Sequence, residues 1–180
     1  KHIMEIHKVT AFKVCASSAM RDAKNSDEIL ARVKKEAGLE IQIISGDREG
    51  KTILGVPLDQ IGLEPNDFYL YIDVGGGSTE LGFLGIGKLI ANRSFNIGTL
   101  RLLNDQVNDT EWREMLEWIK ATKNINFELS AIGVGGNINH VMKHYGKAGK
   151  PYLSISILKR VMMYMDDLSM GERVRELGLK

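Results

Sequence analysis

The sequence predicts an α/β fold in two lobes, of which the second is the more complete. Phe68–Ile72 is apolar and aromatic without a chain breaker, and Leu81–Ile86 is apolar apart from glycine, as in buried strands. Apolar residues at helical spacing follow from Asp109 onward, and a strand pattern near Leu129–Val134 runs into another helical pattern. Strand patterns that give way to helix patterns in this manner favour a sheet covered by helices.

The first lobe, residues 1–62, is predicted to contain two strands and two helices. A strand over Lys8–Ala16 leads into a turn of small residues, and a strand over Glu40–Ile44 leads into a helix around Asp47–Val56. Between them we expect a helix that Ser26 caps and Gly38 ends, with an apolar face made of Ile29, Leu30, Val33 and Ala37. The segment Pro57–Asp67 has two prolines, Gly62 and scattered charges, so we place the hinge there.

The second lobe, residues 63–180, begins with a predicted three-stranded meander. Its strands are Phe68–Val74, Thr79–Ile86 and Leu89–Phe95, with a turn at Gly87-Lys88. A helix from Asp109 or Thr110 follows, and the strand near Leu129–Val134 comes next. We expect the inward side of that helix to consist of Trp112, Met115, Leu116 and Ile119.

Three strands, a helix, a strand and a helix form the order of a ribonuclease-H-like domain. Two further helices are predicted at Ser156–Leu168 and Ser169–Leu177, and Ser169 and Glu172 have the spacing of a capping box. The fold class is therefore predicted as one largely complete ribonuclease-H-like lobe plus part of a second.

Composition excludes several classes of protein. The 180 residues are 43% hydrophobic and 26% charged, which is enough to bury a core and unlike a disordered chain. No apolar run approaches the roughly 20 residues that span a bilayer, and Lys1–Lys8 is too polar for a signal peptide, so we expect a cytoplasmic protein. A formal net charge of +1 gives no support for specific nucleic-acid binding. Cys15 lies in an apolar run and is expected to be an inert core thiol.

The segment from Asp73 to Glu80 is the most informative motif. It joins two predicted strands and consists of Asp-Val-Gly-Gly-Gly-Ser-Thr-Glu. In a hairpin of this shape Asp73 and Glu80 face each other, and the glycines expose amides to an anion with no Cβ in the way. This pattern suits phosphoryl chemistry with Mg²⁺. A flexible turn is the alternative reading, and the absence of a lysine after the glycines argues against a strand-to-helix P-loop.

A second glycine turn supports the phosphate-site reading. The segment Gly133-Val-Gly-Gly136 follows a short strand pattern and precedes a helix pattern over Asn137–Lys143. Such a corner directs free amides and the positive end of a helix dipole toward a ligand. Simple close packing of a helix on a strand would also use these glycines. The two loops together favour a phosphate site.

Several separated motifs resemble the exopolyphosphatase and guanosine pentaphosphate phosphohydrolase family of the actin-like ATPase superfamily. Asp73–Glu80, Phe95-Asn-Ile-Gly98-Thr-Leu-Arg101-Leu and Gly133-Val-Gly-Gly136 occur in the family's order and spacing. Upstream, Ala16-Ser-Ser-Ala-Met-Arg21-Asp-Ala-Lys-Asn25 and Ile43-Ile-Ser-Gly-Asp-Arg-Glu49 resemble two further family segments. The resemblance extends over essentially the whole chain and implies an actin-like ATPase fold.

The chain departs from the family pattern in two places. No segment of the Asp-x-Gly-Ser-Asn-Ser type precedes Ala16, so we expect an internal piece of a longer protein that lacks half of its cleft. Arg48 stands where the family has the first of two acids, and Gly50 stands where it usually has alanine. We therefore expect turnover by the isolated chain to be near background. We also expect an exposed apolar strand edge near Lys8–Ala16, through which the chain self-associates as a homodimer.

The resemblance and the loop chemistry together imply a hydrolase of terminal phosphoanhydride bonds. Asp73 and Glu80 are expected to hold Mg²⁺ and organise water, with Glu49 as the general base beside the catalytic Glu80. The substrate is expected to be polyphosphate or a phosphorylated guanine nucleotide. The predicted phosphate-binding residues are Arg21, Gly75, Gly76, Gly77, Ser78, Gly135 and Gly136.

Two other functional readings remain open. A phosphate or nucleotide sensor would use the same cradle without turnover, while a sugar or acetate kinase of the same superfamily would not explain the upstream motifs. His140 and His144, one helical turn apart, could share a metal, but no third ligand accompanies them, so we expect rim or surface residues.

Overall fold

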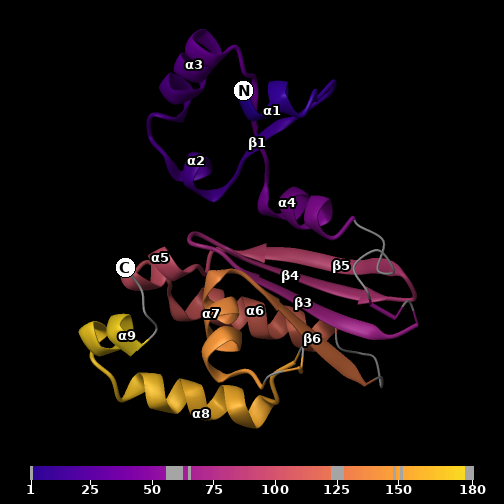
Figure 1. Ribbon diagram of the computed structural model, residues 1–180, viewed down its shortest axis with the longest axis vertical. Helices are drawn as coiled ribbons and strands as arrows, with labels where there is room; N and C mark the ends of the chain where they lie inside the picture. Colours follow the sequence, from indigo (N-terminus) through magenta and orange to yellow (C-terminus); the bar gives the residue numbers. More distant parts are fainter. Residues whose placement is uncertain are drawn as a thin grey trace. The chain divides into compact units, whose positions relative to one another are not determined.

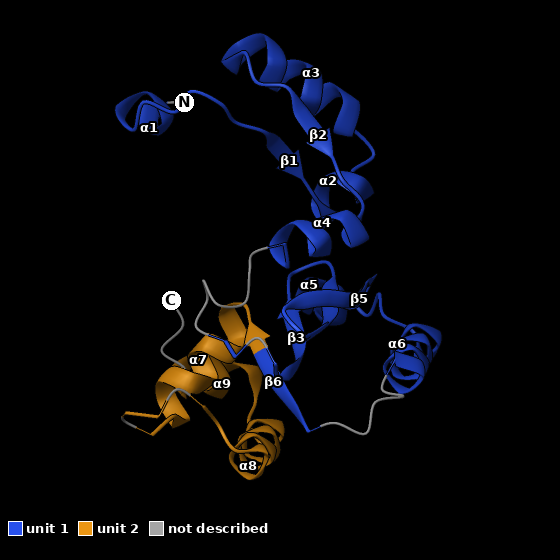
Figure 2. Cartoon of the chain, turned by 90° about the vertical axis from the view of Figure 1, so that its right-hand side faces the viewer, with its two compact units in different colours: residues 1–132 blue, residues 133–180 orange. Residues whose placement is uncertain are grey.

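The computed structural model describes residues 2–55, 63–64, 66–122, 128–147, 149–150 and 152–176. Backbone contacts divide the chain into two compact units, residues 1–132 and 133–180 (Figure 2). The predicted boundary between residues 62 and 63 separates two lobes of the fold, which is a different criterion from the number of contacts within each unit. That boundary stays a prediction. Most of the proposed hinge, residues 57–62 and 65, lies outside the described residues, as does Val56.

The first part of unit 1 contains α1 (His2–Ile6), β1 (Val14–Ala16), α2 (Ser18–Asp22), α3 (Ser26–Ala37), β2 (Ile41–Ile43) and α4 (Gly46–Ile53) (Figure 1). The strands β1 and β2 pair in parallel, with Cys15 opposite Gln42. The predicted strand over Lys8–Ala16 is therefore too long, because β2 offers partners only to its last three residues. The helix α1 was not predicted.

The helix α3 confirms the predicted helix and its end, but not its cap. Gly38 ends it with φ of 65°, a left-handed conformation that suits glycine. Asn25, rather than Ser26, occupies the N-cap position, and its side chain makes no capping hydrogen bond. Beside α3, a groove of about 1030 Å³ runs along β1 and β2. Phe12, Val14, Leu39 and Ile41 line it, and Phe12 is 58% exposed, in agreement with the predicted apolar edge.

The second part of unit 1 is a four-stranded sheet in the order β5-β4-β3-β6. Its strands are β3 (Phe68–Val74), β4 (Thr79–Gly85), β5 (Lys88–Phe95) and β6 (Leu129–Val134), and β3, β4 and β5 form an antiparallel meander. The helices α5 (Thr99–Leu103) and α6 (Asp109–Thr122) separate β5 from β6. This arrangement confirms the ribonuclease-H-like order of three strands, a helix and a strand, with the short α5 as an addition.

The core lies between the sheet and α6. Leu81, Phe95, Ile97 and Met115 are buried together, and Trp118 and Ile119 pack against them. Trp118 also contacts the ring of Phe83, with centroids 5.5 Å apart. The predicted inward face of α6 was therefore wrong for Trp112 and Leu116, which are 41% and 52% exposed. The helix is rotated so that its second tryptophan, not its first, enters the core.

Unit 2 contains α7 (Gly136–Tyr145), α8 (Ile155–Asp166) and α9 (Met170–Glu176). The predicted capping box is confirmed, because the Ser169 amide donates to Glu172 Oε2 at 2.9 Å and the Glu172 amide donates to Ser169 Oγ at 3.4 Å. The Ser169 hydroxyl, which donates to Glu172 Oε2 at 2.6 Å, and the Ser169 amide lower the pKa of the Glu172 carboxyl. The helix predictions in this unit are accurate to within a few residues.

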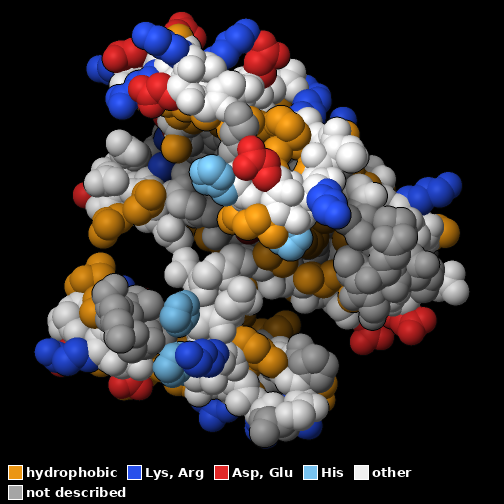
Figure 3. Space-filling model, turned by 45° about the horizontal axis from the view of Figure 1, so that its top comes forward, with side chains coloured by type: hydrophobic (Ala, Val, Ile, Leu, Met, Phe, Trp, Pro, Cys, Tyr) orange, Lys and Arg blue, Asp and Glu red, His pale blue; other side chains and the backbone are white. Residues whose placement is uncertain are grey.

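Two predictions about surface properties have different outcomes. Cys15 is exposed rather than buried, because β1 belongs to a two-stranded sheet and pairs with β2 alone, so the core-thiol prediction was wrong. Figure 3 shows Lys and Arg side chains interspersed with Asp and Glu on the face that it presents. No helix among the described residues has the length and apolarity to cross a membrane.

Candidate active site

In the loop between β3 and β4, the carbonyls of the three glycines are turned toward α5. Gly75 O accepts from the Thr99 amide at 3.0 Å, and Gly76 O accepts from the Leu100 amide at 2.8 Å. Gly77 O accepts from Arg101 Nε at 2.6 Å. Gly98 has no Cβ, and a Cβ there would lie 2.4 Å from Gly76 O, so glycine permits this close approach.

The amides on the other side of these peptides remain available. In a trans peptide the N–H points opposite to the C=O, so carbonyls directed at α5 send the amides of Gly76, Gly77 and Ser78 the other way. No hydrogen bond from these three amides is present among the described residues. The amide of Gly75 differs, because it donates to Ser78 O at 2.9 Å within the loop. Of the four amides predicted to bind phosphate, those of Gly76, Gly77 and Ser78 make no hydrogen bond among the described residues, and the phosphate role of all four stays a prediction.

Asp73 and Glu80 are directly opposite each other across the β3–β4 ladder, as predicted. Opposite residues of an antiparallel pair place their side chains on the same face of the sheet. Glu80 is 5% exposed, and its Oε1 accepts hydrogen bonds from Ser78 Oγ at 2.7 Å and Ser94 Oγ at 2.9 Å. A buried carboxyl is thus fixed beside the loop whose amides make no hydrogen bond among the described residues.

Burial controls the ionisation of this region. It raises the pKa of the Glu80 carboxyl; the hydroxyls of Ser78 and Ser94 oppose this change, and the charges of Glu49 and Asp73 add to it. Tyr71 donates to Asp73 Oδ2 at 3.3 Å. Burial, followed by the charge of Asp73, raises the pKa of Tyr71 to about 12. The carboxyl groups of Glu49, Asp73 and Glu80 therefore concentrate negative charge in this region, and a bound cation would reduce their mutual repulsion.

The helix α4 brings Glu49 to the same region. It is docked on β5 by two hydrogen bonds, from the Ser94 amide to Asp47 Oδ1 at 3.1 Å and from Asn92 Nδ2 to Asp47 O at 2.9 Å. A Cβ on Gly46 would lie 2.1 Å from Ser94 Oγ, so the helix start approaches the strand because residue 46 is glycine. Ser45 caps α4 by accepting from the Arg48 amide at 3.3 Å.

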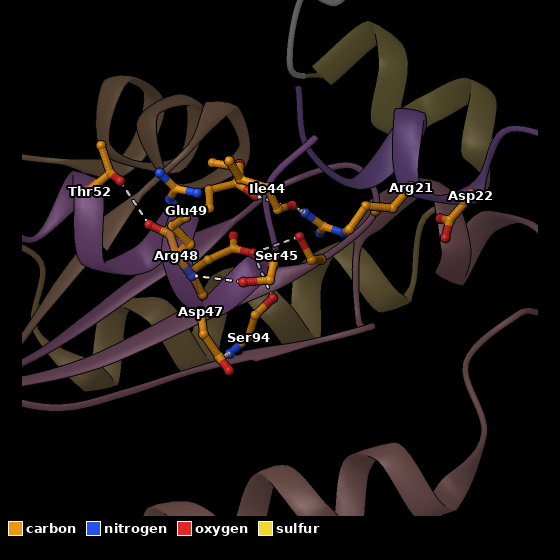
Figure 4. A network of polar contacts seen from close by, with 12 residues as sticks. Arg21, Asp22, Ile44, Ser45, Asp47, Arg48, Glu49, Thr52 and Ser94 are labelled. Carbon is orange, nitrogen blue, oxygen red and sulfur yellow. Dashed lines mark hydrogen bonds and ion pairs between the residues drawn. The ribbon is translucent and has the colours of Figure 1, made fainter. Parts of the chain in front are cut away.

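Arg21 extends from α2 toward Ile44 and Glu49, whereas its neighbour Asp22 points away from them (Figure 4). Arg21 Nη1 donates to Ile44 O at 2.7 Å and lies 3.5 Å from Glu49 Oε2. This Glu49 oxygen is buried and makes no hydrogen bond within the described part of the chain. Both side chains are 24% exposed, so the pair lies at the edge of the site rather than in solvent. Arg48, next in sequence, is exposed.

The first lobe also covers the glycine loop. A Cβ on Gly77 would lie 2.0 Å from Ser18 Oγ, which places the start of α2 over the loop. Asp22 at the end of α2 forms an ion pair with Arg101 Nη2. The segment with Arg21 is thus attached to the glycine loop at both of its ends.

The donor set fits a metal ion that phosphates help to hold. In the described ranges no group of three Asp, Glu, His or Cys side chains forms a complete ligand set. Mg²⁺ commonly uses one or two carboxylates, with water and phosphate oxygens in its other positions. Asp73 and Glu80 face each other and match that requirement. Burial, with a contribution from the charge of Asp73, raises the pKa of the Glu80 carboxyl.

Two groups of predicted residues belong to unit 2. Gly135 has φ of 110° and occupies the N-cap position of α7, and Gly136 is its first residue. Their place opposite the glycine loop stays a prediction. His140 and His144 stack with ring centroids 6.2 Å apart, and His144 is exposed, in agreement with a position at the surface or rim.

Sequence reasoning missed Ser94, Asp47 and Ser18. Ser94 is opposite Glu80 in the β4–β5 register, so pairing the predicted strands could have found it. Asp47 and Ser18 offered no comparable signal, because their contacts with β5 and Gly77 join segments far apart in sequence.

Parts of the chain are similar to known phosphatases. Exopolyphosphatase 1 of Mycobacterium tuberculosis is 39% identical over 66 residues, which are 37% of this chain and 19% of that protein. The Guanosine-5'-triphosphate,3'-diphosphate pyrophosphatase of Aeromonas hydrophila is 38% identical over 105 residues, which are 57% of this chain and 20% of that protein. The chain thus spans about a fifth of these two relatives.

A solved structure extends the likeness to the whole chain. The crystal structure of the Aquifex aeolicus member of the Ppx/GppA protein family matches with a TM-score of 0.69 and 26% identity, over 98% of this chain and 62% of that one. This match confirms the predicted fold class. The model of the Ppx/GppA phosphatase family matches residues 1–171, and the chain belongs to that family.

Proposed function

We propose that this chain forms part of the active site of a hydrolase that removes terminal phosphate from polyphosphate or guanosine pentaphosphate. The observation that supports this most is the free set of amides at Gly76, Gly77 and Ser78 beside the buried carboxyl of Glu80. Amides with fixed carbonyls need no reorganisation to stabilise the charge that develops on a transferring phosphoryl group. Two curated relatives with these substrates in their names add support.

Different residues of the chain would bind phosphate, accept the proton of water and position the carboxylate. The amides of Gly76, Gly77 and Ser78 bind phosphate oxygens, and the free donors of Arg21 add positive charge. Glu49 accepts a proton from the attacking water through its buried Oε2, which carries no competing hydrogen bond among the described residues. Ser78 and Ser94 hold Glu80 in one orientation. Asp73 and Glu80 would hold Mg²⁺, whose charge would offset that of the phosphoryl group.

The direct test measures phosphate release by the full-length protein from polyphosphate and from guanosine pentaphosphate, with Mg²⁺ or with EDTA. We expect release that needs Mg²⁺ and that Glu80→Gln lowers by about 10² to 10⁴. Absence of release from both substrates, in a folded protein that also fails to bind tripolyphosphate, would refute the proposal. The ratio of the release rates from polyphosphate and from guanosine pentaphosphate identifies the substrate. The cytoplasmic location and the homodimer stay predictions.

A sensor is the second candidate, and one observation favours it. Arg21 Nη1 lies 3.5 Å from Glu49 Oε2, so the oxygen proposed to act on water already has an arginine partner. The sensor would bind tripolyphosphate with the same amides and release no phosphate. Binding without turnover in the full-length protein would therefore select this candidate.

A further inference from the structure

Arg101 makes two contacts that the proposed chemistry does not use directly. Its Nε donates to Gly77 O at 2.6 Å, and its Nη2 forms an ion pair with Asp22. The Arg101 side chain is 20% exposed, whereas that of Asp22 is 55% exposed. One guanidinium thus joins the glycine loop to the end of α2.

The Gly77 carbonyl is held differently from its neighbours. Backbone amides of α5 hold the carbonyls of Gly75 and Gly76, so side-chain changes in α5 leave those bonds intact. Gly77 O accepts from a side chain, and the opposite end of the same peptide is the Ser78 amide. The direction of the Ser78 N–H therefore depends on Arg101.

The ion pair with Asp22 extends this control to the first lobe. Asp22 follows Arg21 directly, and Arg21 contacts Glu49. Ser18, one turn earlier in α2, lies over Gly77. The Arg101 guanidinium, which contacts both Gly77 O and Asp22, therefore sets the distance between the loop amides and the segment that carries Arg21.

We propose that Arg101 is a positioning residue that aims the Ser78 amide at the phosphate and fixes Arg21 beside it. This inference rests on the proposed phosphate site. A planar guanidinium with several N–H donors can bind a carbonyl and a carboxylate at the same time, whereas a lysine here would bind only one of them. Arg101 itself touches neither phosphate nor water in this role.

The test measures sodium tripolyphosphate binding to the chain by calorimetry, for wild type, Arg101→Lys and the control Arg32→Lys. Arg32 is exposed and pairs with Glu36 within α3, away from the loop. Loss of one charge-assisted hydrogen bond predicts binding about 10-fold weaker for Arg101→Lys, and no change for the control. Asp22→Asn should weaken binding less, and adding it to Arg101→Lys should cost nothing further.

Two readouts separate positioning from general stability. Millimolar guanidinium should restore tripolyphosphate affinity to Arg101→Ala and leave the wild type unchanged. In the full-length protein, Arg101→Lys should lower kcat at the same time as it weakens binding, and the melting temperature should stay near that of Arg32→Lys. Equal tripolyphosphate affinity for Arg101→Lys, Asp22→Asn and wild type would overturn the inference while leaving the proposed function intact. No tripolyphosphate binding by the wild-type chain, together with no binding and no phosphate release by the full-length protein, would refute both.

Discussion

The two sides of the candidate site are built on different principles. The β3–β4 side presents backbone amides from a loop whose carbonyls are fixed by α5, and its acid, Glu80, is buried in a strand pair. The α2–α4 side presents the partly buried side chains of Arg21 and Glu49. Arg21 bonds to Ile44 O, and α4, which carries Glu49, is held on β5 by two hydrogen bonds to Asp47. Hydrogen bonds to α5 fix the loop on the first side, whereas the second side depends on contacts between segments that are far apart in sequence. Changes on the first side should therefore have the larger effects.

The largest effect is expected at Glu80. Glu80→Gln keeps an oxygen for the hydroxyls of Ser78 and Ser94, so the fold and tripolyphosphate binding should persist. Phosphate release by the full-length protein should fall by about 10² to 10⁴, the usual worth of a positioned catalytic carboxylate. The control Glu114→Gln alters a surface ion pair with Arg93 and should leave release unchanged. Normal turnover in Glu80→Gln would remove this residue from the mechanism.

Glu49→Gln tests the opposite side in the same assay. If Glu49 is the general base, phosphate release should fall by about 10², with tripolyphosphate affinity unchanged or improved because Arg21 is freed. Full activity would show that the base lies elsewhere and that Arg48 marks a relocated group.

Gly98→Ala should damage the β3–β4 side without touching an acid. The new Cβ would lie 2.4 Å from the Gly76 carbonyl oxygen, so the loop must move. We expect tripolyphosphate binding to weaken by about 10-fold or more, measured by calorimetry. Gly171→Ala is the matched control, since nothing lies within 4 Å of its added Cβ. Unchanged affinity in Gly98→Ala would mean that the loop–α5 contact does not position the amides.

The raised pKa of Glu80 predicts a smaller effect on stability. A carboxyl whose pKa is raised by folding stabilises the protein at low pH and loses that contribution as pH rises from its ordinary value of 4.5 through its folded value. Glu80→Gln does not titrate, so its melting temperature relative to wild type should increase across this window and then level off. A difference that is independent of pH would contradict the burial account.

The smallest effect concerns Tyr71. Because its pKa is raised to about 12, the phenol's contribution to stability is present below its ordinary value of 10.0 and is lost as pH rises through about 12. Wild type should therefore lose more stability than Tyr71→Phe between these values, measured by urea unfolding. Equal losses would show that the phenol is not constrained by burial and Asp73.

The same contrast explains which features could be predicted from sequence. The pairing of Asp73 with Glu80 follows from strand alternation around a short loop, which is local information. The contacts of Ser18 with Gly77 and of Asp47 with β5 depend on where distant segments pack, and no local pattern encodes that. Trp112 and Trp118 both fit an apolar helix face, and only the rings of Phe83 and Phe95 select Trp118. Cys15 was misjudged because an apolar run does not reveal an unpaired edge.

The most direct test of the central claim follows amide resonances of the glycine loop while sodium tripolyphosphate is added to the ¹⁵N-labelled chain. The account predicts that the amides of Gly76, Gly77 and Ser78 shift together and saturate, whereas the Gly75 amide, bonded to Ser78 O, shifts least. Resonances of these three amides that stay in place at saturating tripolyphosphate, or a shift confined to Gly75, would contradict it.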